Sequence, residues 1–144
     1  MRIEYDAILE SLLEQVQHHD EEIQATTFEW ITEFLHVVPA MVVRFTPRLI
    51  SAVLPCLAHP APAIQTAAIK ANTELFAAVE HQLPDGGGGL DYFATTNALK
   101  QHLLDQHDQT RLQALEWLMM LHAKSPTKLF SIQDGSISVL LRVL

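Results

Sequence analysis

Cysteine is almost absent from this chain, since Cys56 is the only one in 144 residues. A single thiol allows neither an internal disulfide nor a multi-cysteine zinc site, so the sequence fits a reducing compartment such as the cytosol. Basic residues are also scarce, with 9 Lys and Arg against 17 Asp and Glu and a formal charge of −8. Such a surface repels nucleic-acid phosphates and anionic lipid headgroups, and no basic patch offsets it. We therefore expect no nucleic-acid partner.

Long apolar runs and catalytic motifs are missing too. No window reaches the roughly 18 consecutive apolar residues that a membrane-spanning helix needs, so we expect any membrane contact to be indirect. The four glycines at 86–89 lack the following Lys-Ser/Thr and the preceding strand of a phosphate loop, which favours a flexible linker. No other recognised catalytic motif is present. The sequence therefore predicts no enzyme activity, no catalytic residues and no cofactor.

Amphipathic periodicity is what the chain does have. Apolar residues recur at intervals of three and four, which is the spacing of helices with one buried side, and no strand-like alternation competes. The polar turns HHDEE, HPAP and QHDQ divide these stretches into pairs. We expect an all-α fold in a single segment, 1–144, with repeats at about 3–38, 42–82 and 90–124 and a partial repeat at 126–144.

The second helices of these pairs resemble one another. When FEWI at 28–31 is placed over LEWL at 115–118, Trp30 coincides with Trp117. The same register aligns three further residues at steps of 41 and 46: Gln24, Gln65 and Arg111. Two helices per unit of 40–47 residues are typical of HEAT and armadillo repeats. We predict a HEAT/armadillo-like α-solenoid of about three and a half helical pairs, with an irregular helical bundle as the alternative.

The last residues and the glycine run carry two further expectations. Leu140, Leu141 and Leu144 fit the first helix of a fourth repeat without its partner helix, so we expect a fragment of a longer solenoid or an edge covered by another copy. These three leucines are a candidate self-association edge and indicate a homo-oligomer. The Gly-rich segment at 84–89 accounts for the longer second step, and we interpret it as a linker, native or engineered.

Histidine is more frequent than usual, with eight in the chain. His18, His19, His59 and His107 fall at or near the predicted turns, which permits a metal site or a proton-sensing ridge. Successive repeats lie about 10 Å apart, too far for shared tetrahedral ligation. We expect capping or solvated side chains and no metal ligands.

The polar side of the second helices is the candidate partner surface, because second helices usually line the concave face of such solenoids. It consists of Glu29, Glu33, Lys70, Glu74, Glu116 and Met120. The column of Glu29, Lys70 and Glu116 is either an ion-pair ladder or a docking surface of mixed charge. Trp30 and Trp117 lie on apolar stripes, so we expect both in the core between repeats and not as partner anchors.

The chain also resembles a known family. DEEIQATTFEWITEFL, RLISAVLPCLAH and TRLQALEWLMMLHAKSPTKLF are similar to the central HEAT repeats of the vacuole-morphology scaffold of the phosphatidylinositol 3-phosphate 5-kinase (PIKfyve) complex. The resemblance covers nearly the whole chain apart from the glycine loop, and its motifs are structural. It implies a cytoplasmic scaffold, peripheral on vacuolar or late endosomal membranes, in the complex that controls phosphatidylinositol 3,5-bisphosphate synthesis and turnover.

The resemblance implies protein partners: the lipid kinase, a Sac-type phosphatase, or a phosphoinositide-binding β-propeller regulator. A tubulin-binding module or a nuclear transport adaptor is the alternative function. Tubulin-binding modules present basic and aromatic residues in the turns within each repeat, and HHDEE, HPAP and QHDQ have few of either. An enzyme is a third hypothesis, motivated only by the histidines.

Overall fold

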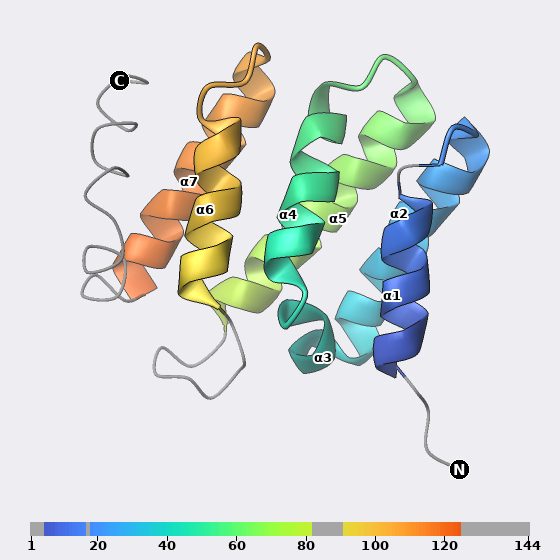
Figure 1. Ribbon diagram of the computed structural model, residues 1–144, viewed down its shortest axis with the longest axis horizontal. Helices are drawn as coiled ribbons and strands as arrows, with labels where there is room; N and C mark the ends of the chain where they lie inside the picture. The colour runs from blue at the N-terminus through green and yellow to red at the C-terminus, as the bar shows by residue number, and fades with distance from the viewer. Residues whose placement is uncertain (1–4, 17, 82–90, 125–144) are drawn as a thin grey trace.

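The computed structural model describes residues 5–16, 18–81 and 91–124, and within these ranges every regular element is a helix (Figure 1). In chain order the elements are α1 (Tyr5–Gln15), α2 (Glu21–Val37), α3 (Pro39–Val43), α4 (Thr46–Val53), the 3₁₀ helix η1 (Leu54–Ala58), α5 (Pro62–Glu80), α6 (Tyr92–His102) and α7 (Asp108–Lys124).

These helices form two layers of a solenoid. In Figure 1, α1, α4 and α6 lie in front, and α2, α5 and α7 lie behind them. Each front helix precedes its rear partner in the chain, which gives the pairs α1/α2, α4/α5 and α6/α7. Contacts between successive pairs join α2 to α5, α5 to α7 and α4 to α6. The predicted all-α, HEAT-like solenoid is therefore confirmed.

Local sequence accounts for where several helices begin and change. The Asp20 carboxylate accepts hydrogen bonds from the backbone N–H groups of Glu22 and Ile23 at 2.9 and 3.3 Å, and so caps α2. Pro47 lies in the first turn of α4, where its missing N–H costs nothing. The first helix of the second pair changes to 3₁₀ geometry at Leu54, because Pro55 cannot donate an i to i−4 hydrogen bond.

Hydrogen bonds from register-equivalent residues support the repeat register, with equivalent acceptors in the first two pairs. Gln24 Nε2 donates to the carbonyl of Val16 at 2.6 Å, and Gln65 Nε2 donates to that of Leu57 at 3.1 Å. The third equivalent residue, Arg111, donates from a guanidinium nitrogen to the carbonyl of Asp105 at 2.8 Å. In each pair a side chain of the second helix thus donates a hydrogen bond to a backbone carbonyl at or just after the end of the first helix. Carbonyls at helix ends lack partners within the helix.

The two tryptophans differ in burial, although the register equates them. Trp117 is 0% exposed and packs against α5, where Phe76 meets its ring edge-on at 5.1 Å between centroids. Its place in the core is confirmed. Trp30 is 55% exposed, so the prediction that it is a core residue was wrong. Trp117 is covered by the second helix of the preceding pair, and within the described residues no second helix precedes α2.

Candidate partner-binding face

Two grooves cross the outer side of α2, α5 and α7, which we call the second-helix face. The α2–α5 groove has a volume of about 790 Å³ and is lined by Glu29, Trp30, Thr32, Glu33, Pro62, Ala63, Thr66, Ala67 and Lys70. The α5–α7 groove has a volume of about 430 Å³ and is lined by Leu57, Ile69, Asn72, Thr73, Phe76, Gln109, Leu112, Gln113 and Glu116. Hollows of this size accept whole side chains of a partner.

The second helix of each groove contributes equivalent positions, whereas the first helix shares only one. Adding 46 residues carries Lys70 onto Glu116 and Thr66 onto Leu112, and adding 41 carries Thr32 onto Thr73. The repeat therefore keeps one wall of the groove, while the sequence changes its chemistry. The α2–α5 groove is charged on both sides, and the α5–α7 groove is more apolar, because an exposed leucine replaces a threonine.

Most of the predicted partner surface lies in these grooves. Glu29, Glu33 and Lys70 line the α2–α5 groove, and Glu116 lines the α5–α7 groove. Glu74 is half-buried on α5, and its carboxylate lies 3.0 Å from Nε2 of His36 on α2. In the described part of the chain, no ion pair joins Lys70 to Glu29 or Glu116, so the predicted ion-pair ladder does not form there.

Met120 does not belong to this surface, and its predicted exposure was wrong. It is only 8% exposed and lies in the core cluster, while its neighbour Met119 is 69% exposed. The register places Met120 at the position that Glu33 occupies on α2 and Glu74 occupies on α5. Neighbouring helix positions differ by about 100°, so a modest rotation of one helix exchanges an exposed position for a buried one. The register predicts which residues correspond, but not the rotation of each helix.

A buried chain of hydrogen bonds joins α5 to α7 beneath the α5–α7 groove. The Trp117 indole N–H donates to Oδ1 of Asn72 at 2.9 Å, and Nδ2 of Asn72 donates to Oε1 of Gln113 at 2.9 Å. Gln113 Nε2 then donates to a Glu116 carboxylate oxygen at 3.3 Å. Our sequence reasoning missed Asn72. The available signal was an amide on an apolar stripe, at the position that Ile31 and Leu118 occupy in the other repeats.

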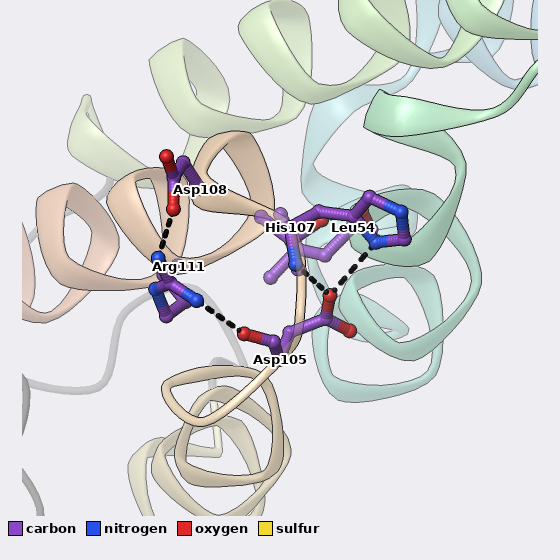
Figure 2. A network of polar contacts seen from close by, with 6 residues as sticks. Leu54, Asp105, His107, Asp108 and Arg111 are labelled. Atoms are coloured by element: carbon purple, nitrogen blue, oxygen red, sulfur yellow. Dashed lines mark hydrogen bonds and ion pairs between the residues drawn. The ribbon is translucent and has the colours of Figure 1, made fainter.

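The described arginines form ion pairs elsewhere on the molecule. In the front layer Arg44 pairs with Asp6 at 3.6 Å and Arg48 pairs with Glu10 at 2.6 Å. At the α6–α7 turn, Figure 2 shows Arg111 bonded to the Asp108 carboxylate and to the carbonyl of Asp105. In the described residues, Glu29 and Glu33 have no hydrogen-bond or ion-pair partner. The second-helix face therefore keeps uncompensated negative charge.

Four described groups have shifted pKa values, and burial lowers that of Lys124 against the opposing effect of the Glu80 charge. The His107 backbone N–H donates to the Asp105 carboxylate at 2.8 Å, and this hydrogen bond lowers the pKa of Asp105 (Figure 2). Burial lowers the pKa of His102, against the opposing effect of the Asp105 charge. Burial raises the pKa of the Cys56 thiol, which favours its inert, protonated form. These shifts follow from packing and turn geometry, and none involves a residue that lines the two grooves.

The turn histidines act in local structure. Nδ1 of His18 accepts a hydrogen bond from the backbone N–H of Asp20 at 3.0 Å, and Nδ1 of His59 accepts one from that of Ala61 at the same distance. Both contacts fit the expected capping role. Across the described ranges, no three His, Cys, Asp or Glu side chains gather where they could hold a metal ion. None of the helices described is long and apolar enough to cross a bilayer.

Some predictions fall outside the residues that the structure describes. These are the self-association edge at Leu140, Leu141 and Leu144, the partial repeat at 126–144 and the Gly-rich segment at 84–89. They remain predictions.

Comparison with known proteins identifies similar chains. The sequence is 27% identical over 142 residues, 99% of this chain, to a "Protein VAC14 homolog" of Arabidopsis thaliana. It is 24% identical over 151 residues, 98% of this chain, to a "Protein VAC14 homolog" of Schizosaccharomyces pombe. It is 21% identical over 145 residues, 100% of this chain, to "Vacuole morphology and inheritance protein 14" of Saccharomyces cerevisiae. No family model matches the chain.

These alignments confirm the resemblance to the vacuole-morphology scaffold that the sequence strings indicated. They run through almost every residue of this chain, so the similarity is not limited to one repeat. The chain spans 19%, 19% and 16% of the lengths of these three relatives.

Proposed function

We propose that this VAC14-like chain is a non-catalytic scaffold segment that binds a protein partner on its second-helix face. The observation that carries the proposal is the pair of grooves between successive second helices, which expose Trp30, Ile69 and Leu112 beside carboxylates that form no ion pair within the described chain. Exposed apolar groups beside charged groups are typical of surfaces that bind another protein. Two grooves formed by one repeat geometry suit a surface that holds another protein.

The relatives direct the proposal toward vacuole morphology. We propose that the parent scaffold acts in the PIKfyve complex, which controls phosphatidylinositol 3,5-bisphosphate synthesis and turnover on vacuolar and late endosomal membranes. It would be cytoplasmic and peripheral, with its membrane contact made through partners. The lipid kinase, the Sac-type phosphatase and the β-propeller regulator are the candidate partners. The name of the yeast relative, a vacuole morphology and inheritance protein, supports this assignment.

A pull-down with these three proteins tests the proposal. The test variant is Glu29→Lys with Glu33→Lys, which reverses two exposed carboxylates of the α2–α5 groove. The matched control is Glu14→Lys, an exposed carboxylate on α1 in the other layer. We expect one candidate to bind the wild-type chain, to lose roughly tenfold in affinity with the test variant and to keep its affinity with the control.

The contrary results are equally defined. If none of the three proteins binds the wild-type chain, the assignment to this complex is wrong. If a partner binds but only Glu14→Lys weakens it, the partner lies on the front layer and the second-helix face is wrong. Tubulin and a nuclear cargo protein belong in the same experiment, because binding to either one alone would favour the alternative module.

A further inference from the structure

The α5–α7 groove has an apolar rim contributed by both of its helices. Ile69 on α5 is 46% exposed and Leu112 on α7 is 57% exposed, and Phe76 lies partly buried between the helices. Aliphatic side chains facing each other across a hollow of 430 Å³ leave room for an apolar group between them. The rim therefore favours a partner that inserts an aliphatic or aromatic side chain.

The floor of this groove is fixed before any partner arrives. The hydrogen bonds from Trp117 to Asn72 and from Asn72 to Gln113 tie the two helices together, and Trp117 and Asn72 are buried. The Phe76 ring packs edge-on against Trp117. Because hydrogen bonds already hold the two helices together, the site loses little conformational freedom when a partner binds, which favours affinity.

The charge at the groove is negative and unbalanced. Glu116 is exposed and accepts one hydrogen bond from Gln113, so most of the acceptor capacity of its carboxylate faces solvent. No Lys or Arg lines this groove, and the described part of the chain offers Glu116 no ion pair. The Glu116 carboxylate at the outer end of the hydrogen-bond chain can therefore accept a hydrogen bond or pair with a cation from a partner.

From these three observations we propose that the α5–α7 groove anchors a basic segment of a partner protein. An apolar side chain of that segment enters between Ile69 and Leu112, and a neighbouring Lys or Arg pairs with Glu116. The inference rests on the proposed scaffold function and adds the chemistry of the partner. Charge complementarity selects this occupant, since the whole chain has a formal charge of −8.

The other hollows and a second copy fit this chemistry less well. The α2–α5 groove contains Lys70, which repels an incoming cation. The hollow between α1, α4 and α6 contains Arg48, which is already paired with Glu10. A second copy of this chain is negatively charged overall, so on average it repels the Glu116 carboxylate.

A synthetic probe tests the groove directly. The probe is a dye-labelled peptide of leucine and lysine, and its counterpart has glutamate at every lysine position. By fluorescence anisotropy we expect the lysine peptide to bind and the glutamate peptide to show no binding. Binding of the lysine peptide should weaken severalfold as salt rises from low to physiological concentration.

Variants locate the binding. We expect Leu112→Asp and, on the facing helix, Ile69→Asp each to weaken lysine-peptide binding at least tenfold, and Glu116→Gln to weaken it severalfold. All three residues are exposed or half-exposed, so the variants should fold, which circular dichroism checks. The matched control is Phe93→Asp, which places the same charge at an apolar residue of α6 that is 52% exposed.

Three results would overturn the inference: equal binding of both peptides, unchanged affinity in both aspartate groove variants, or an equal loss with Phe93→Asp. A dimer in light scattering that Leu112→Asp dissolves would also overturn it, because the occupant would then be a second copy. The pull-down separates the two proposals. If a partner still binds the Leu112→Asp variant, the groove assignment alone is wrong. If no partner binds the wild-type chain, the scaffold function is wrong.

Discussion

Trp30 and Trp117 show how far a single residue depends on its neighbours. They occupy equivalent positions in similar strings, FEWI and LEWL, yet one is exposed and the other is fully buried. The difference comes from α5, which supplies Asn72 and Phe76 to Trp117. Residue type therefore indicates a potential contact, and the adjacent repeat decides whether the contact is made.

This contrast predicts very different stability effects for the same substitution. Trp117→Ala should lower the free energy of unfolding by about 3–5 kcal/mol, because it opens a cavity and leaves Asn72 without its indole donor. Trp30→Ala should change it by no more than about 0.5 kcal/mol, as is usual for exposed sites. Urea denaturation of both variants measures these values. Equal costs would mean that Trp30 is covered in solution.

His102 predicts a pH dependence of stability. Its ring is buried, and Nε2 has no hydrogen-bond partner among the described residues, so burial lowers its pKa in the folded chain. The unfolded chain then binds a proton more readily than the folded chain. As pH falls below about 6.5, the ordinary histidine value, His102 should make a growing unfavourable contribution to stability, which levels off below its folded pKa.

The measurement is the melting temperature of the wild-type chain and of His102→Gln between pH 5 and pH 8. The variant should have a smaller loss of stability on acidification, while His19→Gln, a change at an exposed turn residue that retains His102, should keep the wild-type profile. Parallel profiles for wild type and His102→Gln would show that other groups dominate the acid sensitivity.

At the scale of elements, short local signals determine where the helices begin. Asp20 illustrates this, because its carboxylate satisfies two backbone N–H groups at the start of α2. Asp91 caps α6 with a single hydrogen bond, which its carboxylate accepts from the N–H of Ala94 at 3.0 Å. The turn HHDEE contains several acids, and the structure shows that Asp20, and not Glu21, is the cap.

Asp20→Ala should therefore destabilise the chain by about 1 kcal/mol, with a range of about 0.5–2 kcal/mol for caps of this kind. Glu21→Ala is the matched control, since it removes the same charge one residue later and breaks no side-chain cap. It should cost less, because only the favourable interaction with the helix dipole is lost. Thermal denaturation compares the two, and an equal loss in both would assign the effect to charge and not to the hydrogen bonds.

At the scale of the whole molecule, the two layers differ in how their charges are paired. Arginines of the front layer form ion pairs with acids of α1, and the second-helix face keeps glutamates that lack such partners in the described residues. This difference between the layers does not follow from composition, because a net charge of −8 does not tell where the charged residues lie. The proposed basic partner depends on this difference.

Self-association is the remaining prediction at this scale. If Leu140, Leu141 and Leu144 form an uncovered apolar edge, the chain should associate at micromolar concentration, and replacing all three with Asp should give a monomer in light scattering. Leu104→Asp is the control, an aspartate at an exposed leucine elsewhere in the chain. A monomeric wild-type chain would show that this edge is covered or absent.

The sequence by itself determined the class of fold, the pairing of helices and the repeat register. Periodicity and turn residues act over a few positions, and Gln24 and Gln65 make equivalent bonds because each sits at the same place in its own pair. Tertiary structure alone decided that Trp30 is exposed, that Met120 is buried and that Asn72 connects two helices. Those outcomes depend on the rotation of each helix and on which neighbour covers it, and both are set by packing between repeats across 40 or more residues.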